Sequence, residues 1–218
     1  RGDKTASKTL NRATDTTRQP GSTFKILAAY SAALDAGGLT LASVQDDAPY
    51  TYAGANGKSV NNYDRRYRGF TTLREAITDS INIVTVKTLA QAGVSLGWQY
   101  VQEYGFTTVD SRDMNEALAL GGITQGVSNL ELTAAYAAIA NQGTYIRPKF
   151  YTKILDHDGN VLIDNTTPES HTVIKDTTAW LLTSAMEDVM TSGTGTSAYF
   201  GSSMAQAGKS GTTTSSRD

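Results

Sequence analysis

The chain has 218 residues, of which 39% are hydrophobic and 18% are charged, and its formal net charge is −2. This length allows one large domain or two small ones, and the apolar fraction is too high for a disordered chain. The charge provides no basic field for nucleic acid, and no run approaches the roughly 20 apolar residues of a membrane span. The absence of cysteine excludes disulfides, thiolate zinc sites and cysteine nucleophiles. Any chemistry must therefore come mainly from hydroxyls, amines, amides and carboxylates.

The first half of the chain predicts a buried helix followed by a long loop. Residues 24–34 are apolar on nearly every side and end before Gly37-Gly38, which is typical of a helix in the centre of a domain. Residues 39–68 have no clear periodicity, and loops of this length are often functional walls or lids. The capping box at 72–75 predicts a helix start, and a second helix is expected over 83–91.

The second half predicts short helices and hairpin strands. Helices are expected over 95–104, 130–141 (after a capping box at 128–131) and 176–190 (capped by Asp176), strands near 149–155 and 160–164, and a further strand over 204–211. We find no internal repeat and no Gly/Ser linker. A single α+β domain is therefore the simplest interpretation.

Ser22 and Lys25 form an S-x-x-K motif at the start of the predicted buried helix. A spacing of three puts both side chains on one helix face. A serine hydroxyl needs a base to become a nucleophile, and a lysine can be that base if burial and a nearby cation lower its pKa. The alternative is a serine N-cap followed by a lysine that reaches the surface. A lysine in so apolar a helix is costly, which favours a functional role.

Ser80 and Asn82 form an S-x-N motif at the break between two predicted helices. A hydroxyl and an amide at this spacing could relay a proton and hold a peptide carbonyl, whereas the simpler interpretation is a helix cap. Ser59 and Asn61 form a rival S-x-N in the long loop. Its Gly/Asn-rich context predicts no rigid platform, so we favour the pair at 80 and 82.

Lys209, Ser210 and Gly211 form the third motif. A phosphate-binding P-loop is excluded because six residues, not four, separate Gly201 from Gly208. As a strand, the segment would alternate residues 209, 211 and 213 on one face with 210, 212 and 214 on the other. A flexible Ser/Thr-rich tail is the alternative.

In chain order, the three motifs are S-x-x-K, S-x-N and K-S-G. The set is similar to the transpeptidase domain of class A, bifunctional penicillin-binding proteins of Gram-positive type, within the penicilloyl serine transferase and serine β-lactamase superfamily. The resemblance extends over the whole chain through the segments LNRAT (10–14), RQPGS (18–22), ALGG (119–122) and AAY (134–136).

The resemblance implies an α+β fold in which an antiparallel sheet and flanking helices surround a central buried helix. It implies acyl transfer on the D-Ala-D-Ala end of peptidoglycan stem peptides, inhibition by β-lactam antibiotics, no metal or organic cofactor and no nucleic-acid partner. It also assigns roles: Ser22 as nucleophile, Lys25 as its base, Ser80 as proton relay, Asn82 as ligand of the substrate amide, Lys209 as the positive charge, Ser210, Gly211, Thr212 and Thr214 as substrate-binding residues, and the N–H groups of Ser22 and Thr212 as the oxyanion hole.

The chain departs from the family pattern in two ways. Ser210 stands where the family more often has threonine, which keeps the hydroxyl. Only 21 residues precede Ser22 and 7 follow Gly211. We therefore expect residues 1–218 to be an incomplete transpeptidase domain whose sheet is completed by the rest of the polypeptide or by a companion chain. The membrane anchor and glycosyltransferase domain would lie outside this chain, and the location would be the extracellular face of the bacterial cytoplasmic membrane.

Two alternatives share this fold. A class A β-lactamase requires a deacylating glutamate in an E-x-x-L-N context, and no glutamate of the chain has one: Glu75, Glu103, Glu116, Glu131, Glu169 and Glu187. A β-lactam-sensing receptor domain, which is acylated but turns over no peptide, remains open.

Overall fold

The computed structural model describes residues 9–53, 57–201 and 203–213. Thr214, a predicted substrate-binding residue, lies outside these ranges. Among the described residues, no helix combines the length and the hydropathy needed to cross a membrane.

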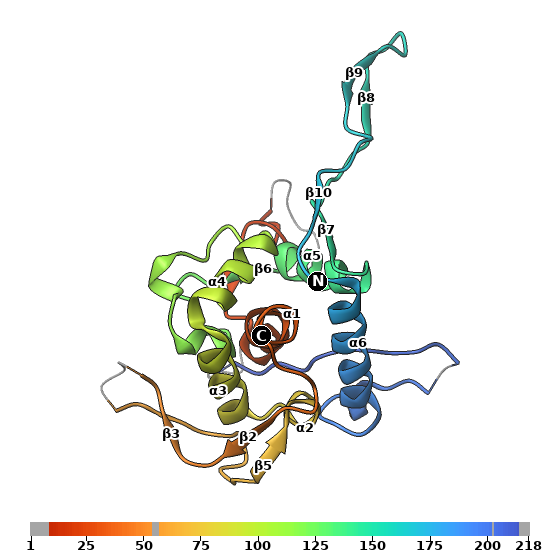
Figure 1. Ribbon diagram of the computed structural model, residues 1–218. Coiled ribbons are helices and arrows are strands. Elements are labelled where there is room, and N and C mark those ends of the chain that lie inside the picture. The colour runs from red at the N-terminus through yellow and green to blue at the C-terminus, as the bar shows by residue number, and fades with distance from the viewer. Residues whose placement is uncertain (1–8, 54–56, 202, 214–218) are drawn as a thin grey trace.

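A central helix (residues 21–35) runs through the middle of the molecule (Figure 1). It begins with a 3-10 turn over Gly21–Thr23, continues through a π-helical segment over Ile26–Tyr30 and ends as α1 (Ser31–Asp35). Every side chain from position 24 to position 33 is fully buried, which confirms the buried helix predicted from its apolar sequence. The π-helical turn was not predicted. It coincides with Ser31, whose backbone N–H and side-chain hydroxyl both donate to the carbonyl of Ile26.

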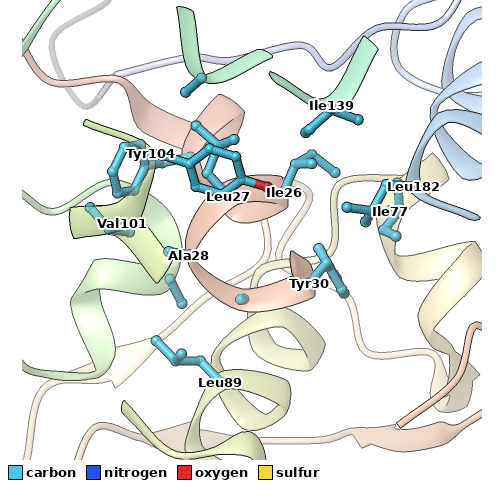
Figure 2. Packing of buried hydrophobic residues seen from close by; sticks show 14 of the residues in the cluster. Ile26, Leu27, Ala28, Tyr30, Ile77, Leu89, Val101, Tyr104, Ile139 and Leu182 are labelled. Carbon is cyan, nitrogen blue, oxygen red and sulfur yellow. The ribbon is translucent and has the colours of Figure 1, made fainter. Parts of the chain in front are cut away.

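Among the described residues, five α-helices surround the central helix: α2 (Leu73–Thr78), α3 (Asn82–Ala92), α4 (Val94–Glu103), α5 (Asn129–Ala140) and α6 (Asp176–Thr191). Short 3-10 helices cover Ser111–Asp113, Glu116–Leu120 and Thr196–Ala198. Both predicted capping boxes are present, at Thr72 with Glu75 and at Ser128 with Glu131. Asp176 is the first residue of α6 and not its cap, because Lys175 holds the extended N-cap conformation. These helices supply apolar side chains that pack around the central helix (Figure 2): Ile77, Leu89, Val101, Ile139 and Leu182.

One close approach in this core requires a glycine. A Cβ at Gly97 of α4 would lie 2.5 Å from the carbonyl oxygen of Ala28 in the central helix. Because real Cβ atoms do not approach so closely, glycine lets the two backbones pack directly against each other.

In the part of the chain that the structure describes, the strands pair as five separate two-stranded antiparallel sheets. They are β1 (Thr17–Arg18) with β6 (Val127–Ser128), β2 (Val44–Asp47) with β5 (Gly69–Thr72), β3 (Tyr50–Thr51) with β4 (Ser59–Val60), β7 (Thr144–Ile146) with β10 (Ser170–Thr172), and β8 (Lys153–Leu155) with β9 (Val161–Asp164). The predicted hairpin is thus confirmed as β8 and β9, and it extends away from the body of the molecule (Figure 1). The helices and antiparallel strands together confirm the α+β class.

The strand predicted over 204–211 is wrong, because residues 204–213 form neither a strand nor a helix. A strand needs a neighbour to share its ladder of hydrogen bonds, and the described residues place none beside this segment. One backbone bond, from the N–H of Gly208 to the carbonyl of Met186 at 3.2 Å, ties it to α6.

Candidate active site

Ser22 stands at the first turn of the central helix, where the backbone is tightly constrained. Gly21 has φ +55°, and a Cβ there would lie 2.9 Å from the carbonyl oxygen of Thr212. A Cβ at Gly121 would in turn lie 2.5 Å from the carbonyl oxygen of Gly21. Glycines at 21 and 121 therefore let three segments of backbone meet beside Ser22. Among the described residues the Ser22 hydroxyl has no hydrogen-bond partner, and its side chain is half-buried.

Lys25 is fully buried, and its amine has three polar neighbours. Its Nζ lies 2.7 Å from the carbonyl oxygen of Ser80, 3.2 Å from the hydroxyl of Ser80 and 2.6 Å from Oδ1 of Asn82. Burial, and then the charge of Lys209, hold the pKa of Lys25 well below its usual value. These contacts join the S-x-x-K and S-x-N motifs, and they do not include a bond between Lys25 and Ser22.

Ser80 occupies the turn between α2 and α3. The N–H of Ile81 donates to Ala76 at 2.9 Å and the N–H of Ser80 donates to Ile77 at 3.3 Å, which is the Schellman pattern at a helix C-terminus. Ser80 fills the left-handed position of this motif, with φ +55°, where glycine is usual. A serine here costs about 1 kcal/mol in backbone strain, and such strain is concentrated at functional sites.

Asn82 opens α3 and is fixed on both sides of its amide. Its Nδ2 donates to the carbonyl of Asn61 at 2.7 Å, while its Oδ1 faces Lys25. The rival motif in the long loop therefore contributes a backbone carbonyl to this site. Its own Ser59 lies in β4, so the expectation that the rival lacks a rigid platform is wrong.

Lys209 also contacts the hydroxyl of Ser80. Its Nζ lies 2.7 Å from the hydroxyl of Ser80 and 3.1 Å from the carbonyl oxygen of Ser210. Burial lowers the pKa of Lys209 to about 8. The two lysines thus share one hydroxyl as a hydrogen-bond partner.

A cavity of about 520 Å³ brings the three motifs together. It is lined by Ser22, Tyr63, Ser80, Asn82, Thr194, Ser210, Gly211, Thr212 and Thr213. Ser210 is held by a 2.6 Å contact between its hydroxyl and that of Thr194. Lys25 and Lys209 lie behind this surface, in contact with Ser80.

Three residues of the cavity were missed as site residues in the sequence: Tyr63, Thr194 and Thr213. Tyr63 lies in the long loop over 39–68, where no motif marks it as a site residue. Thr194 follows α6 in a glycine-rich turn, where its N–H donates to the carbonyl of Thr78 at 3.2 Å. That turn is close-packed, since a Cβ at Gly193 would lie 2.3 Å from the same carbonyl. The run Ser192-Gly193-Thr194-Gly195, just after the helix predicted over 176–190, was the available signal.

The contacts of Lys25 define what a neutral amine could do here. A neutral lysine has two N–H donors and one lone pair, and a carbonyl or amide oxygen can only accept. The two donors are therefore directed to the carbonyl of Ser80 and to Oδ1 of Asn82. The lone pair is left to accept a proton from a hydroxyl, which is the requirement for a general base.

Known proteins share both the sequence and the fold. The family model for the penicillin binding protein transpeptidase domain matches residues 1–218. Penicillin-binding protein 1F of Bacillus subtilis is 39% identical over 207 residues, covering 95% of this chain and 28% of that protein. Penicillin-binding protein 1A of Neisseria flavescens is 36% identical over 224 residues, covering 97% of this chain and 27% of that protein. The chain thus spans little more than a quarter of the length of these relatives.

Solved structures agree. The crystal structure of penicillin-binding protein 1A from Haemophilus influenzae superposes with a TM-score of 0.82 at 28% identity, covering 94% of this chain and 36% of that one. The D,D-transpeptidase domain of a peptidoglycan glycosyltransferase from Eggerthella lenta has the same fold, with a TM-score of 0.78 at 23% identity over 95% of this chain and 57% of that one. The match over the full length, together with three motifs gathered around one cavity, shows that the chain belongs to the transpeptidase domain family of the penicillin-binding proteins.

Proposed function

We propose that the protein carrying this chain is a peptidoglycan D,D-transpeptidase that cross-links stem peptides through an acyl-enzyme on Ser22. The observation that carries the proposal is the fully buried Lys25, which contacts Ser80 and Asn82 beside the cavity that Ser22 lines. Peptides ending in D-Ala-D-Ala and β-lactams are the proposed ligands. The proposed location is the outer face of the bacterial cytoplasmic membrane.

Acylation uses the groups in the cavity as follows. The Ser22 hydroxyl gives its proton to Lys25 as its oxygen bonds to the carbonyl carbon of the penultimate D-alanine. The C–N bond to the terminal D-alanine then breaks, and the leaving amine takes a proton through the Ser80 hydroxyl. Because Ser80 contacts Lys25, its hydroxyl can accept the proton that Lys25 took from Ser22 as it gives its own proton to the leaving amine, which restores neutral Lys25.

The substrate is held by its carboxylate, its amide and its reacting carbonyl. Lys209 supplies the positive charge for the terminal carboxylate, and the hydroxyls of Ser210 and Thr212 bind it, with Thr214 as a further expected ligand. Asn82 binds the amide of the substrate, and Gly211 is a further expected substrate contact in the lining of the cavity. The N–H groups of Ser22 and Thr212 form the oxyanion hole, a proposal supported by the proximity of Thr212 N, which lies 3.5 Å from the Cβ position of Gly21.

The fate of the acyl-enzyme separates this function from its alternatives. No aspartate or glutamate is among the described residues that line the cavity. Glu116, for instance, accepts from Tyr50 and from the N–H of Ala53 at 2.9 Å each. With no carboxylate to activate water, an acceptor amine releases the acyl group, which favours a transpeptidase over a β-lactamase. A sensing receptor domain would be acylated but would form no cross-link.

Two measurements test the proposal. Intact mass spectrometry after incubation with penicillin should show one adduct on the wild type and none on Ser22→Ala or Lys25→Ala. Asn82→Ala should slow acylation more than tenfold, since it removes a ligand of both Lys25 and the substrate. An adduct that persists in Ser22→Ala would refute the nucleophile, and acylation without cross-linking of stem peptides would point to the receptor.

A further inference from the structure

Asn62 and Asp47 are buried polar residues of the long loop that the chemistry above does not use. Asp47 ends β2 and is 0% exposed, while Asn62 follows β4 and is 2% exposed. Burying a carboxylate and an amide is unfavourable unless both are fully hydrogen-bonded. Their partners therefore indicate what the arrangement achieves.

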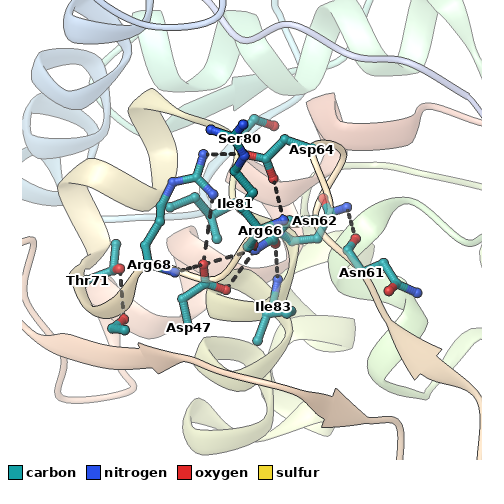
Figure 3. A network of polar contacts seen from close by, with 12 residues as sticks. Asp47, Asn61, Asn62, Asp64, Arg66, Arg68, Thr71, Ser80, Ile81 and Ile83 are labelled. Carbon is teal, nitrogen blue, oxygen red and sulfur yellow. Dashed lines mark hydrogen bonds and ion pairs between the residues drawn. The ribbon is translucent and has the colours of Figure 1, made fainter.

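The two side chains form a polar chain that ends at the site (Figure 3). Nδ2 of Asn62 donates to both carboxylate oxygens of Asp47, at 2.8 and 2.9 Å, and to the carbonyl of Arg66 at 2.8 Å. Asp47 also accepts from the N–H of Arg68 at 2.9 Å. Oδ1 of Asn62 is therefore turned away from Asp47, toward α3.

The oxygen of Asn62 caps the helix that carries Asn82. It accepts from the N–H of Asn82 at 3.0 Å and from the N–H of Ile83 at 3.2 Å. The residue at the N-cap position of α3 is Ile81, whose side chain has no oxygen and makes no cap bond. Asn62, twenty residues earlier, supplies the missing cap.

Asn61 and Asn62 together fix both the backbone and the side chain of Asn82. Asn61 accepts from Nδ2 of Asn82, so the other end of that amide must present its oxygen to Lys25. Asn62 holds the backbone N–H of the same residue. A rotation of the Asn82 side chain would break its bonds to Asn61 and Lys25, and a shift of its backbone would break the bond to Asn62.

We propose that Asn62, oriented by Asp47, is a positioning residue that holds Asn82 against Lys25. The long loop is thereby part of the active-site scaffold as well as a wall of the cavity. The inference rests on the proposed function, because its effect is measured on acylation of Ser22.

The test compares acylation rates of full-length variants with labelled penicillin, alongside their melting temperatures. Asn62→Ala should lower the second-order acylation rate constant at least tenfold. Val101→Ala, which removes buried apolar volume in α4, is the matched control for lost stability and should stay within about twofold of the wild type.

Exchange of the two side chains separates positioning from packing. Asn62→Asp alone places two carboxylates side by side, so this variant should be acylated slowly. In the Asp47→Asn, Asn62→Asp double variant, a carboxylate oxygen again faces α3 and an amide again pairs with a carboxylate, although the carbonyl of Arg66 loses its donor. The double variant should therefore be acylated faster than Asn62→Asp alone, with partial recovery toward the wild-type rate. If Asn62→Ala does not fold, Asp47→Asn carries the test, because Asn62 then loses its carboxylate partner, and a threefold to tenfold loss is expected.

The outcomes are distinct. A wild type that is never acylated refutes the proposed function itself. A wild type that is acylated, with Asn62→Ala or its substitute reacting at the rate of Val101→Ala, overturns the positioning role. An exchanged pair that regains its melting temperature but is acylated no faster than Asn62→Asp alone overturns it as well.

Discussion

Replacement of Lys209 by arginine should change how acylation depends on pH. Burial lowers the pKa of Lys209 to about 8, so this side chain loses half of its charge near that pH. In the proposed function, this charge attracts the terminal carboxylate of the substrate. The acylation rate constant should therefore fall on the alkaline side as Lys209 becomes neutral.

The size of the effect follows from the pKa. Between pH 7 and pH 9 the charged fraction of a group with a pKa of about 8 falls roughly tenfold. Arginine has a pKa above about 12 and keeps its charge over this range. On the acidic side the rate should fall as Lys25 becomes protonated, in both proteins, because the base must be neutral.

The assay is the second-order rate constant for acylation by penicillin from pH 5 to pH 10, which reports the free protein. The wild type should give a bell-shaped profile with an alkaline limb near pH 8. Lys209→Arg should react more slowly at its optimum but lack that limb. Lys153→Arg, in the exposed hairpin, is the matched control and should keep the wild-type shape. An alkaline limb near pH 8 in Lys209→Arg would contradict our assignment of the charge.

Three further predictions concern stability and the hairpin. The Thr85 hydroxyl contacts that of Tyr30 at 2.8 Å and donates to Ile81 at 2.6 Å. In urea titrations, Tyr30→Phe should therefore lower the free energy of unfolding by about 1 kcal/mol and Thr85→Val should lower it by about 2 kcal/mol. The double variant should lose less than the sum of the two. Gly121→Ala should lower the free energy of unfolding by more than about 2 kcal/mol and slow acylation. Gly159→Ala, also at positive φ but with open space around it, should lower the free energy of unfolding by only about 1 kcal/mol. Replacing residues 153–164 by a short glycine turn should leave the melting temperature and acylation rate unchanged, since all residues of β8 and β9 are exposed; a loss of either would show that the hairpin supports the site.

Local signals predicted much of the fold. The capping boxes at Thr72 and Ser128 fixed two helix starts because the cap and its partner are three residues apart. The apolar run after Ser22 predicted the central helix because that signal, too, lies within consecutive residues. The strand predicted around Lys209 was wrong because a strand forms only beside a partner strand, and the sequence of the segment does not show whether a partner is present.

The site residues that local motifs mark were also predicted, and those that depend on distant segments were not. Ser22, Lys25, Ser80, Asn82 and Lys209 were found through motifs within a few residues, and the structure brings all five together. Tyr63, Thr194 and Asn62 act across long sequence distances, and no spacing relates them to the motifs. Nor did the sequence reveal the left-handed conformation of Ser80, because this Schellman motif has no glycine to mark that position.

Burial alone distinguishes the roles of the two lysines. Both amines contact the hydroxyl of Ser80, and two cations so close repel each other, so one of them gives up its proton more readily. Lys25 is fully enclosed, and the desolvation that lowers its pKa is reinforced by the charge of Lys209. Lys209 is partly exposed, and its pKa of about 8 leaves it charged at neutral pH. The enclosed lysine is therefore the one suited to accept a proton from Ser22, and the exposed one is suited to attract a carboxylate.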